Sequence, residues 1–156
     1  MEGHSLEQAK LGALRFATDA RARGYRVGLI RFADDAHALL NPDTGFTQAV
    51  ENLQAYGTTN LAAAIDLATR HLAGASGQRV MCIVTDGLPD SKRKALSAAG
   101  RAIKKGIDIM AIGTEGADAR FLGHLATTDV LSRYVTRDKL QEGITDMARL
   151  LPPKNA

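Results

Sequence analysis

Apolar positions along this chain follow two periods, and together they predict alternating helices and strands. Over 5–23, 61–73 and 137–151 apolar residues recur every three or four positions, which is the spacing of one face of a helix. Apolar runs at 79–85 and 107–113 lack polar alternation, which is typical of strands buried on both faces of a sheet. The alternation of strand and helix after residue 79 predicts a doubly wound, mostly parallel α/β sheet with helices on both faces.

Shorter signals complete this pattern. Ser5 and Gln8 have the spacing of a capping box at the start of the first helix. A turn at Asp34-Asp35 joins strand 25–33 to strand 36–40, so 36–40 is predicted to be an antiparallel edge strand. The remaining expected elements are a helix over 47–54, a helix over 91–105, a helix from Asp118 to about 127, and a short strand near 131–135.

Composition limits the classes of protein to which this chain can belong. A length of 156 residues with 45% hydrophobic and 24% charged residues is typical of one globular domain, expected to span 1–156. A net charge of +3 gives no argument for a polyanionic partner, so nucleic acid is not expected. Cys82 is alone, which excludes an internal disulfide and fits a reducing compartment. Residues 1–20 have an amphipathic pattern rather than that of a signal peptide, and the sequence has no apolar run of the ~20 residues that span a membrane, so a cytoplasmic location is expected.

Three polar loops are candidates for chemistry: Thr58–Asn60, Asp86–Asp90 and Thr114-Glu115. Because the carboxyl ends of parallel strands share one edge of a sheet, we expect these loops to meet. Their hydroxyl and carboxylate oxygens are the donors that Mg²⁺ or Mn²⁺ prefers. Each loop also has a purely structural explanation: Asn60 can cap helix 61–73, and Asp86 can belong to an ordinary strand-to-helix turn.

Motifs for catalysis are absent from the sequence. It contains no G-x-x-x-x-G-K-[ST] or G-x-G-x-x-G phosphate loop and no G-x-S-x-G nucleophile turn. The four His residues show no metal-ligand spacing. We therefore expect a protein that is not an enzyme, with a nucleotide or phosphoester hydrolase on a Rossmann-like sheet as the alternative.

Three segments in order, YGTTNLAAAI, RVMCIVTDGLPD and GIDIMAIG, resemble the von Willebrand factor type A domain family. The resemblance implies a doubly wound α/β fold with a metal-ion-dependent adhesion site at the carboxyl edge of its sheet. It implies Thr59 and Asp86 as metal ligands, with Mg²⁺ or Mn²⁺ completed by a carboxylate of a protein partner. The neighbouring residues expected to contact that partner are Thr58, Asn60, Gly87, Leu88, Pro89, Asp90 and Glu115.

One part of the family pattern is missing from this sequence. The family's first metal loop, D-x-S-x-S, follows a central first strand, and neither that loop nor that strand has a counterpart here. Three arrangements stay open: strand 25–33 pairs directly with 79–85, another chain adds a strand in the gap, or the natural chain begins upstream of Met1. We favour the last, because the helix after Met1 keeps its expected pattern.

The resemblance implies a protein–protein interaction module, with an AAA+ ATPase as the class of partner. Because two side chains cannot hold a strongly hydrated ion, we expect weak Mg²⁺ binding or none. A further alternative is a structural fragment that oligomerises through its open sheet edges.

Overall fold

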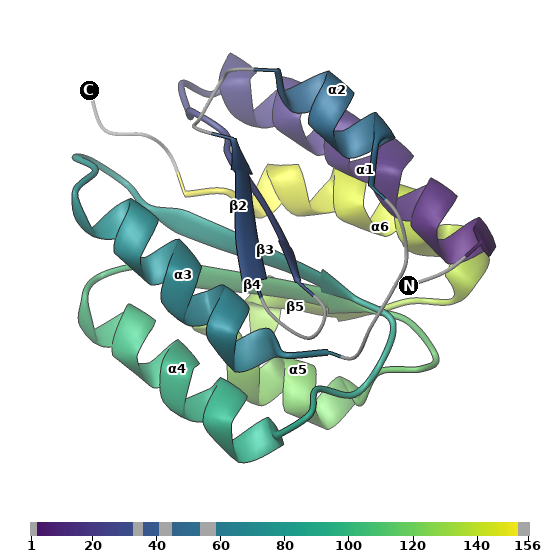
Figure 1. Cartoon of the computed structure of the whole chain (residues 1–156). Helices are drawn as coiled ribbons and strands as arrows, with labels where there is room; N and C mark the ends of the chain where they lie inside the picture. Colours follow the sequence, from purple (N-terminus) through teal and green to yellow (C-terminus); the bar gives the residue numbers. More distant parts are fainter. Residues whose placement is uncertain (1–2, 33–35, 41–44, 54–58, 153–156) are drawn as a thin grey trace.

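The fold is an α/β arrangement in which a three-stranded parallel sheet lies between two layers of helices, as predicted. The computed structural model describes residues 3–32, 36–40, 45–53 and 59–152, with the backbone alone for 37–40. Figure 1 shows α1 and α6 on one face of the sheet and α3, α4 and α5 on the other. The helices are α1 (Gly3–Ala22), α2 (Phe46–Glu51), α3 (Leu61–Ala73), α4 (Lys92–Lys104), α5 (Ala119–Leu125) and α6 (Leu140–Met147). The strands are β1 (Leu29–Phe32), β2 (Ala36–Leu40), β3 (Val80–Thr85), β4 (Asp108–Gly113) and β5 (Ser132–Tyr134). Within this described part, no helix is both long enough and apolar enough to cross a membrane.

Strand β4 is the middle strand of the parallel sheet. It pairs with β3 in register from Val80 opposite Asp108 to Thr85 opposite Gly113, and with β5 on its other side. All residues of β4 after Asp108 are buried, as expected for a strand covered on both faces. The prediction that 79–85 is also buried on both faces is wrong. One face of β3 is buried and the other only half-buried, because β3 lies at the edge of its sheet in the described structure.

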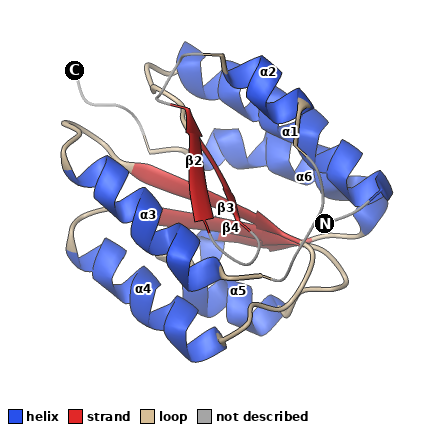
Figure 2. Ribbon diagram, in the orientation of Figure 1, coloured by secondary structure: helices blue, strands red, loops and turns tan. Residues whose placement is uncertain are grey.

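Strands β1 and β2 form a separate antiparallel sheet. The predicted antiparallel strand over 36–40 is confirmed, whereas the turn at Asp34-Asp35 lies outside the described residues. Figure 2 shows this hairpin running in a different direction from β3 and β4. Direct pairing of strand 25–33 with 79–85, one of the three arrangements expected from sequence, is therefore wrong. Among the described strands, β1 pairs with β2 alone and β3 with β4 alone.

Strand β1 begins at Leu29, four positions later than the sequence predicts. The preceding residues end helix α1: Gly24 has a φ of 91°, and the Tyr25 amide donates to the Ala20 carbonyl at 3.1 Å. This arrangement is a common way to satisfy the last carbonyls of a helix. Tyr25 therefore belongs to the helix terminus, and its hydroxyl donates to the Pro152 carbonyl.

Two apolar clusters fill the two faces of the parallel sheet. On the α3–α4–α5 face, the fully buried residues of α4 are all alanines, which let this helix lie close to the sheet; they are Ala95, Ala98, Ala99 and Ala102. On the other face, α1 and α6 approach so closely that a Cβ on Gly12 would lie 2.8 Å from the Ile144 Cβ. The predicted apolar stripe of the last helix is buried here, with Leu140, Ile144, Met147 and Leu151 each at most 5% exposed.

Helix termini follow the sequence signals in some places and not in others. The side chains of Ser91 and Asp118 accept hydrogen bonds from the first turns of α4 and α5, and the sequence predicts the second of these helices to begin at Asp118. The predicted capping box is wrong. Helix α1 already includes Gly3, so Ser5 lies inside it, and the Gln8 Oε1 accepts the Gln141 amide at 3.0 Å. Gln8 therefore provides a hydrogen-bond acceptor for a backbone amide in the first turn of α6 rather than for one in its own helix.

The last helix is interrupted where the sequence predicts one element over 137–151. A 3-10 turn at Arg137–Lys139 precedes α6, and another at Ala148–Leu150 follows it. Thr136, which precedes the first of these turns, donates its hydroxyl to the Asp138 carboxylate at 2.7 Å.

The basic outer face of α4 is partly paired with neighbouring helices. Arg101 donates from one nitrogen to both carboxylate oxygens of Asp66 on α3, each at 3.0 Å. Lys92 pairs with Asp118 at the start of α5 at 2.7 Å. These exposed contacts link α3, α4 and α5 on the solvent side.

Candidate functional site

The candidate site lies where β3 and β4 end and where α3 begins. The Asn60 side chain accepts a hydrogen bond from the Ala63 amide at 3.2 Å, so Asn60 caps α3. Capping was the structural alternative to a functional role for Asn60. Thr59 is the residue directly before this cap. Thr58 lies outside the described residues.

Two hydrogen bonds join the Thr59 loop to the loop after β3. The Thr59 amide donates to the Asp90 Oδ1 at 3.1 Å, and the Asp90 amide donates to the Thr59 carbonyl at 2.8 Å. These residues are 31 positions apart in the chain. The structure thus brings together two loops that the sequence placed at one edge of the sheet.

A third loop, after β4, packs against the loop after β3. A Cβ built on Gly116 would lie 1.8 Å from the Asp86 carbonyl oxygen, so only glycine fits at this position. At the end of β3, the Gly87 amide donates to the Thr85 hydroxyl at 3.4 Å. The Asp86 backbone is therefore held between the end of β3 and the loop that follows β4.

The predicted partner-contact residues differ in their surroundings. Leu88 is 54% exposed, whereas Pro89 beside it is buried. Gly87 is half-buried and Asp90 is exposed. Glu115 turns to another element: its carboxylate accepts the Arg137 amide at 2.9 Å and pairs with the Arg137 Nε at 3.2 Å. Leu88 is thus a large apolar side chain that this edge offers to solvent.

The oxygen donors at this edge are of the chemical type that binds hard divalent cations. Thr59 and Asp86 supply a hydroxyl and a carboxylate, which Mg²⁺ and Mn²⁺ accept. Within the described ranges, no group of three or more His, Cys, Asp or Glu residues is placed to hold a metal. The Thr114 hydroxyl at the end of β4 is fully buried without a hydrogen-bond partner in that same part of the chain. Such a group needs an ordered water or another ligand to satisfy it.

These features agree with a family match over nearly the whole chain. The model of the von Willebrand factor type A domain matches residues 1–149. The chain belongs to the von Willebrand factor type A domain family. This vWA chain matches no curated protein sequence.

Solved structures similar to this vWA chain support the fold. The vWF domain of the type V pili tip protein Mfa5 from Porphyromonas gingivalis has a TM-score of 0.82 at 13% identity, with 93% of this chain and 87% of that chain covered. Proximal thread matrix protein 1 from the mussel byssus has a TM-score of 0.75 at 17% identity, covering 97% of this chain and 43% of that chain. Manganese-loaded Plasmodium vivax TRAP protein has a TM-score of 0.72 at 18% identity, covering 93% and 65%. This vWA chain thus spans less than half the length of the mussel protein.

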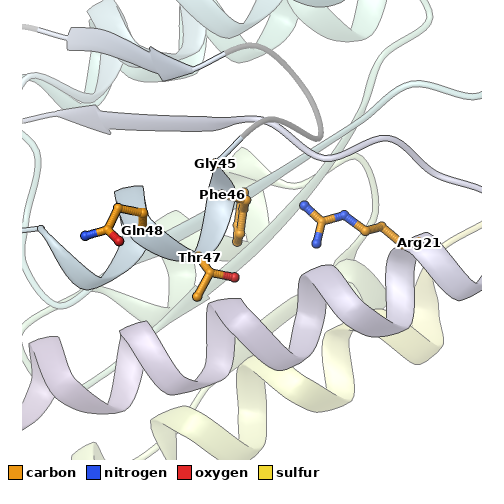
Figure 3. A pocket seen from close by; sticks show the side chains of 5 residues that line it. All are labelled: Arg21, Gly45, Phe46, Thr47 and Gln48. Carbon is orange, nitrogen blue, oxygen red and sulfur yellow. The ribbon is translucent and has the colours of Figure 1, made fainter.

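A separate hollow lies between the end of α1 and the start of α2. Figure 3 shows the side chains that line it, among them Arg21 and Phe46. The Arg21 guanidinium carbon lies 5.2 Å from the centre of the Phe46 ring. This cation–π contact stabilises the packing of α2 on α1. The hollow involves none of the residues of the candidate site.

Two features of the site were not predicted from the sequence. The Thr59–Asp90 pair joins a backbone to a side chain across two loops, and no periodicity marks such a bond. Gly116 could have been found as a glycine in the loop directly after a buried strand, where close backbone approach requires the absence of a Cβ.

Proposed function

We propose that this vWA domain binds a protein partner through the edge formed by Thr59, Asp86 and the loop 87–90. The observation that carries the proposal is the pair of hydrogen bonds between Thr59 and Asp90, which fixes both predicted ligand loops at one edge. Leu88 adds an exposed apolar side chain beside them. A fixed loop that presents one apolar residue next to polar oxygens suits the centre of a protein interface.

A metal ion is a part of this proposal. The hydroxyl of Thr59 and the carboxylate of Asp86 would hold Mg²⁺ or Mn²⁺, and the bound ion would supply positive charge for a carboxylate of the partner. With two protein side chains we expect affinity weaker than about millimolar, because Mg²⁺ dehydrates reluctantly. Manganese in the Plasmodium vivax protein, which shares the fold, supports the choice of metal class.

The class of partner rests on the resemblance alone. It points to an AAA+ ATPase in the cytoplasm, and the single Cys82 is consistent with a reducing compartment. We propose binding rather than catalysis, since the edge offers no nucleophile paired with a base among its described residues. Both statements stay predictions.

The metal edge is tested with Mn²⁺, which broadens the NMR signals of nearby amides. At a small fraction of one equivalent, we expect broadening to centre on Thr59 and on Asp86 to Asp90. Asp86→Asn keeps the side-chain shape but removes the charge, and should abolish the selective broadening. Asp146→Asn is the matched control, because Asp146 is an exposed carboxylate paired with Arg149 at 3.4 Å.

The result can refute the proposal in two ways. Broadening centred on another group of carboxylates would move the metal away from this edge. Equal broadening in the chain and in its Asp86→Asn variant would show that Asp86 is not a ligand.

A further inference from the structure

Helix α4 presents to solvent a face whose charges all have one sign. The helix contacts α3 on one side and α5 on the other, and its fully buried residues are all alanines (Figure 1). No acidic residue lies in the sequence between Asp90 and Asp108. Six cations fall in this stretch, five within α4 and one at its C-cap; they are Lys92, Arg93, Lys94, Arg101, Lys104 and Lys105.

Most of this positive charge is not balanced by the domain itself. Lys92 pairs with Asp118 at 2.7 Å, and Arg101 pairs with Asp66 at 3.0 Å. The other four cations are exposed, and none of the described residues offers an acidic partner to their side chains; they are Arg93, Lys94, Lys104 and Lys105. The face therefore carries four charges that attract acidic groups from outside the domain.

The helices on the opposite face of the sheet balance their exposed charges locally. On α1 the Glu7 carboxylate lies 3.8 Å from the Lys10 ammonium, and the Asp146 carboxylate of α6 lies 3.4 Å from the Arg149 guanidinium. Pairs of this kind, three or four positions apart, are typical of a helix face that meets only water. Helix α4 has no acidic residue with which to form them. Its outer face thus differs from a merely solvated one.

Two features of α4 lower its stability without a gain inside the domain. Arg93 and Lys94 lie in the first turn, where the helix dipole disfavours positive charge. Gly100 lies in the middle of the helix, yet a Cβ there would meet no atom within 4 Å, so no internal contact requires glycine. Residues that break local rules in this way are expected at functional sites.

The most exposed line of α4 has charge at its ends and small residues at its centre. Arg93, Ser97, Gly100 and Lys104 follow one another at steps of three or four positions, so they lie along one side of the helix, and all four are exposed. Beside this line Ile103 is 37% exposed. The surface is therefore flat in the middle, positive at both ends and apolar along one side.

We propose that this line, together with Ile103, docks an amphipathic helix of a partner protein that carries acidic residues. The small side chains of Ser97 and Gly100 let the backbone of the partner approach closely. Acidic residues of the partner would meet Arg93 and Lys104, and its apolar residues would cover Ile103. Helix α4 has 13 residues, which gives a contact about 20 Å long. The proposed metal edge uses none of these residues, so the two proposals are independent.

Other occupants fit this surface less well. Helix α4 has no aromatic side chain on which a nucleic-acid base could stack. A second copy of this chain would offer acidic residues of α1 or α6, but Glu7 and Asp146 there already have cationic neighbours. A partner helix with unpaired acidic residues satisfies both the charge and the apolar side chain.

The test uses a fluorescein-labelled helical peptide made of about three repeats of Leu-Glu-Ala-Leu-Glu-Ala-Glu, which is long enough to cover α4. A peptide of the same composition in scrambled order, without the apolar stripe, is its control. Fluorescence anisotropy with the whole chain measures the affinity, and amide NMR signals locate the contact. We expect the helical peptide to shift signals of α4, to bind at least about tenfold more tightly than the scrambled one, and to bind more weakly as salt is added.

Matched variants separate local from overall charge. Arg93→Glu combined with Lys104→Glu should weaken binding at least about tenfold. Lys139→Glu combined with Arg149→Glu makes the same change of net charge beside α6, on the other face of the sheet, and should leave the affinity within about twofold. Gly100→Leu keeps the charge and adds bulk at the centre of the line. It should weaken binding at least about tenfold although leucine favours the helix.

Several results would overturn the proposal. Equal losses in the two charge-reversed variants would show that only net charge attracts the peptide, and full binding by Gly100→Leu would exclude the close approach of a helix. Equal binding of the scrambled peptide, or NMR shifts centred outside α4, would exclude this docking mode. Single-stranded DNA or vesicles containing phosphatidylserine are measured in parallel. Tighter binding of either one, lost in the Arg93→Glu, Lys104→Glu variant, would assign the face to a different class of partner.

Discussion

Replacing Gly116 by alanine tests the contact that holds the candidate site together. The added Cβ would lie 1.8 Å from the Asp86 carbonyl oxygen and 3.0 Å from the Asp86 carbonyl carbon. Normal contacts between such atoms are about 3.5 Å, so the two backbones must separate by more than an ångström. Since both neighbours are backbone atoms, no side chain can rotate away to relieve the overlap.

The magnitude follows from the cost of overpacking. Inserting a methyl group into a packed region costs about 1–3 kcal/mol, and a rigid backbone neighbour places Gly116→Ala in the upper half of this range. For a domain of this length, 2 kcal/mol corresponds to a decrease in Tm of roughly 4–8 °C. We also expect the amide NMR signals of Asp86 and Gly87 to shift, because the loop after β3 must move.

Gly100→Ala is the matched control for this substitution. Gly100 lies inside α4, and a Cβ there would meet no atom within 4 Å. Alanine is better than glycine in a helix by about 1 kcal/mol, so this variant should be more stable than the parent chain. Urea unfolding of both variants measures the two free energies. A Gly116→Ala variant as stable as the parent chain would refute the close approach of the two loops.

Three further predictions concern the charge, thiol and core of the domain. Hydrogen bonds from Lys92 and from the first turn of α5 lower the pKa of Asp118, so its contribution to stability is present above the usual carboxylate pKa of ~3.9 and is lost as the pH falls through the lowered value. Asp118→Asn keeps the cap but removes the charge, so the unfolding free energy of this variant should fall less between about pH 5 and about pH 2 than that of the parent chain. An equal fall in the unfolding free energies of the two proteins would contradict this. Desolvation of the Cys82 thiol, on the half-buried face of β3, raises its pKa to about 12, so a thiol reagent at about pH 8 should react more slowly with the folded chain than with the unfolded one; equal labelling rates of the two would contradict this. Ile109→Ala should cost about 2–5 kcal/mol in urea unfolding because Ile109 is fully buried, whereas Val130→Ala, at a residue 67% exposed, should stay within about 0.5 kcal/mol.

Local signals were enough where one residue decides the structure of its neighbours. Helix α3 spans 61–73 as predicted, because Asn60 caps its first turn and Gly74 follows its last. The convergence of the Thr59 and Asp86 loops was also predictable, since parallel strands deliver their carboxyl ends to one edge. Neither prediction required knowledge of distant contacts.

Other features depend on residues that are distant in the chain. Gln8 has the spacing of a cap for its own helix, yet it accepts the amide of Gln141, which is 133 positions away. The apolar run of β3 resembles that of β4, but the two strands differ in burial because one lies at the edge of the sheet and the other in the middle. Periodicity cannot distinguish these cases, since strand order is a property of the assembled sheet.

The bonds between Thr59 and Asp90 have a mechanical consequence. A partner that pulls on the loop after β3 also pulls on Thr59, and the next residue caps α3. The same loop leads directly into α4, whose first turn is capped by Ser91. Tension applied at this loop is thus shared between two helices, and the loop cannot be drawn outward without disturbing the first turn of α3.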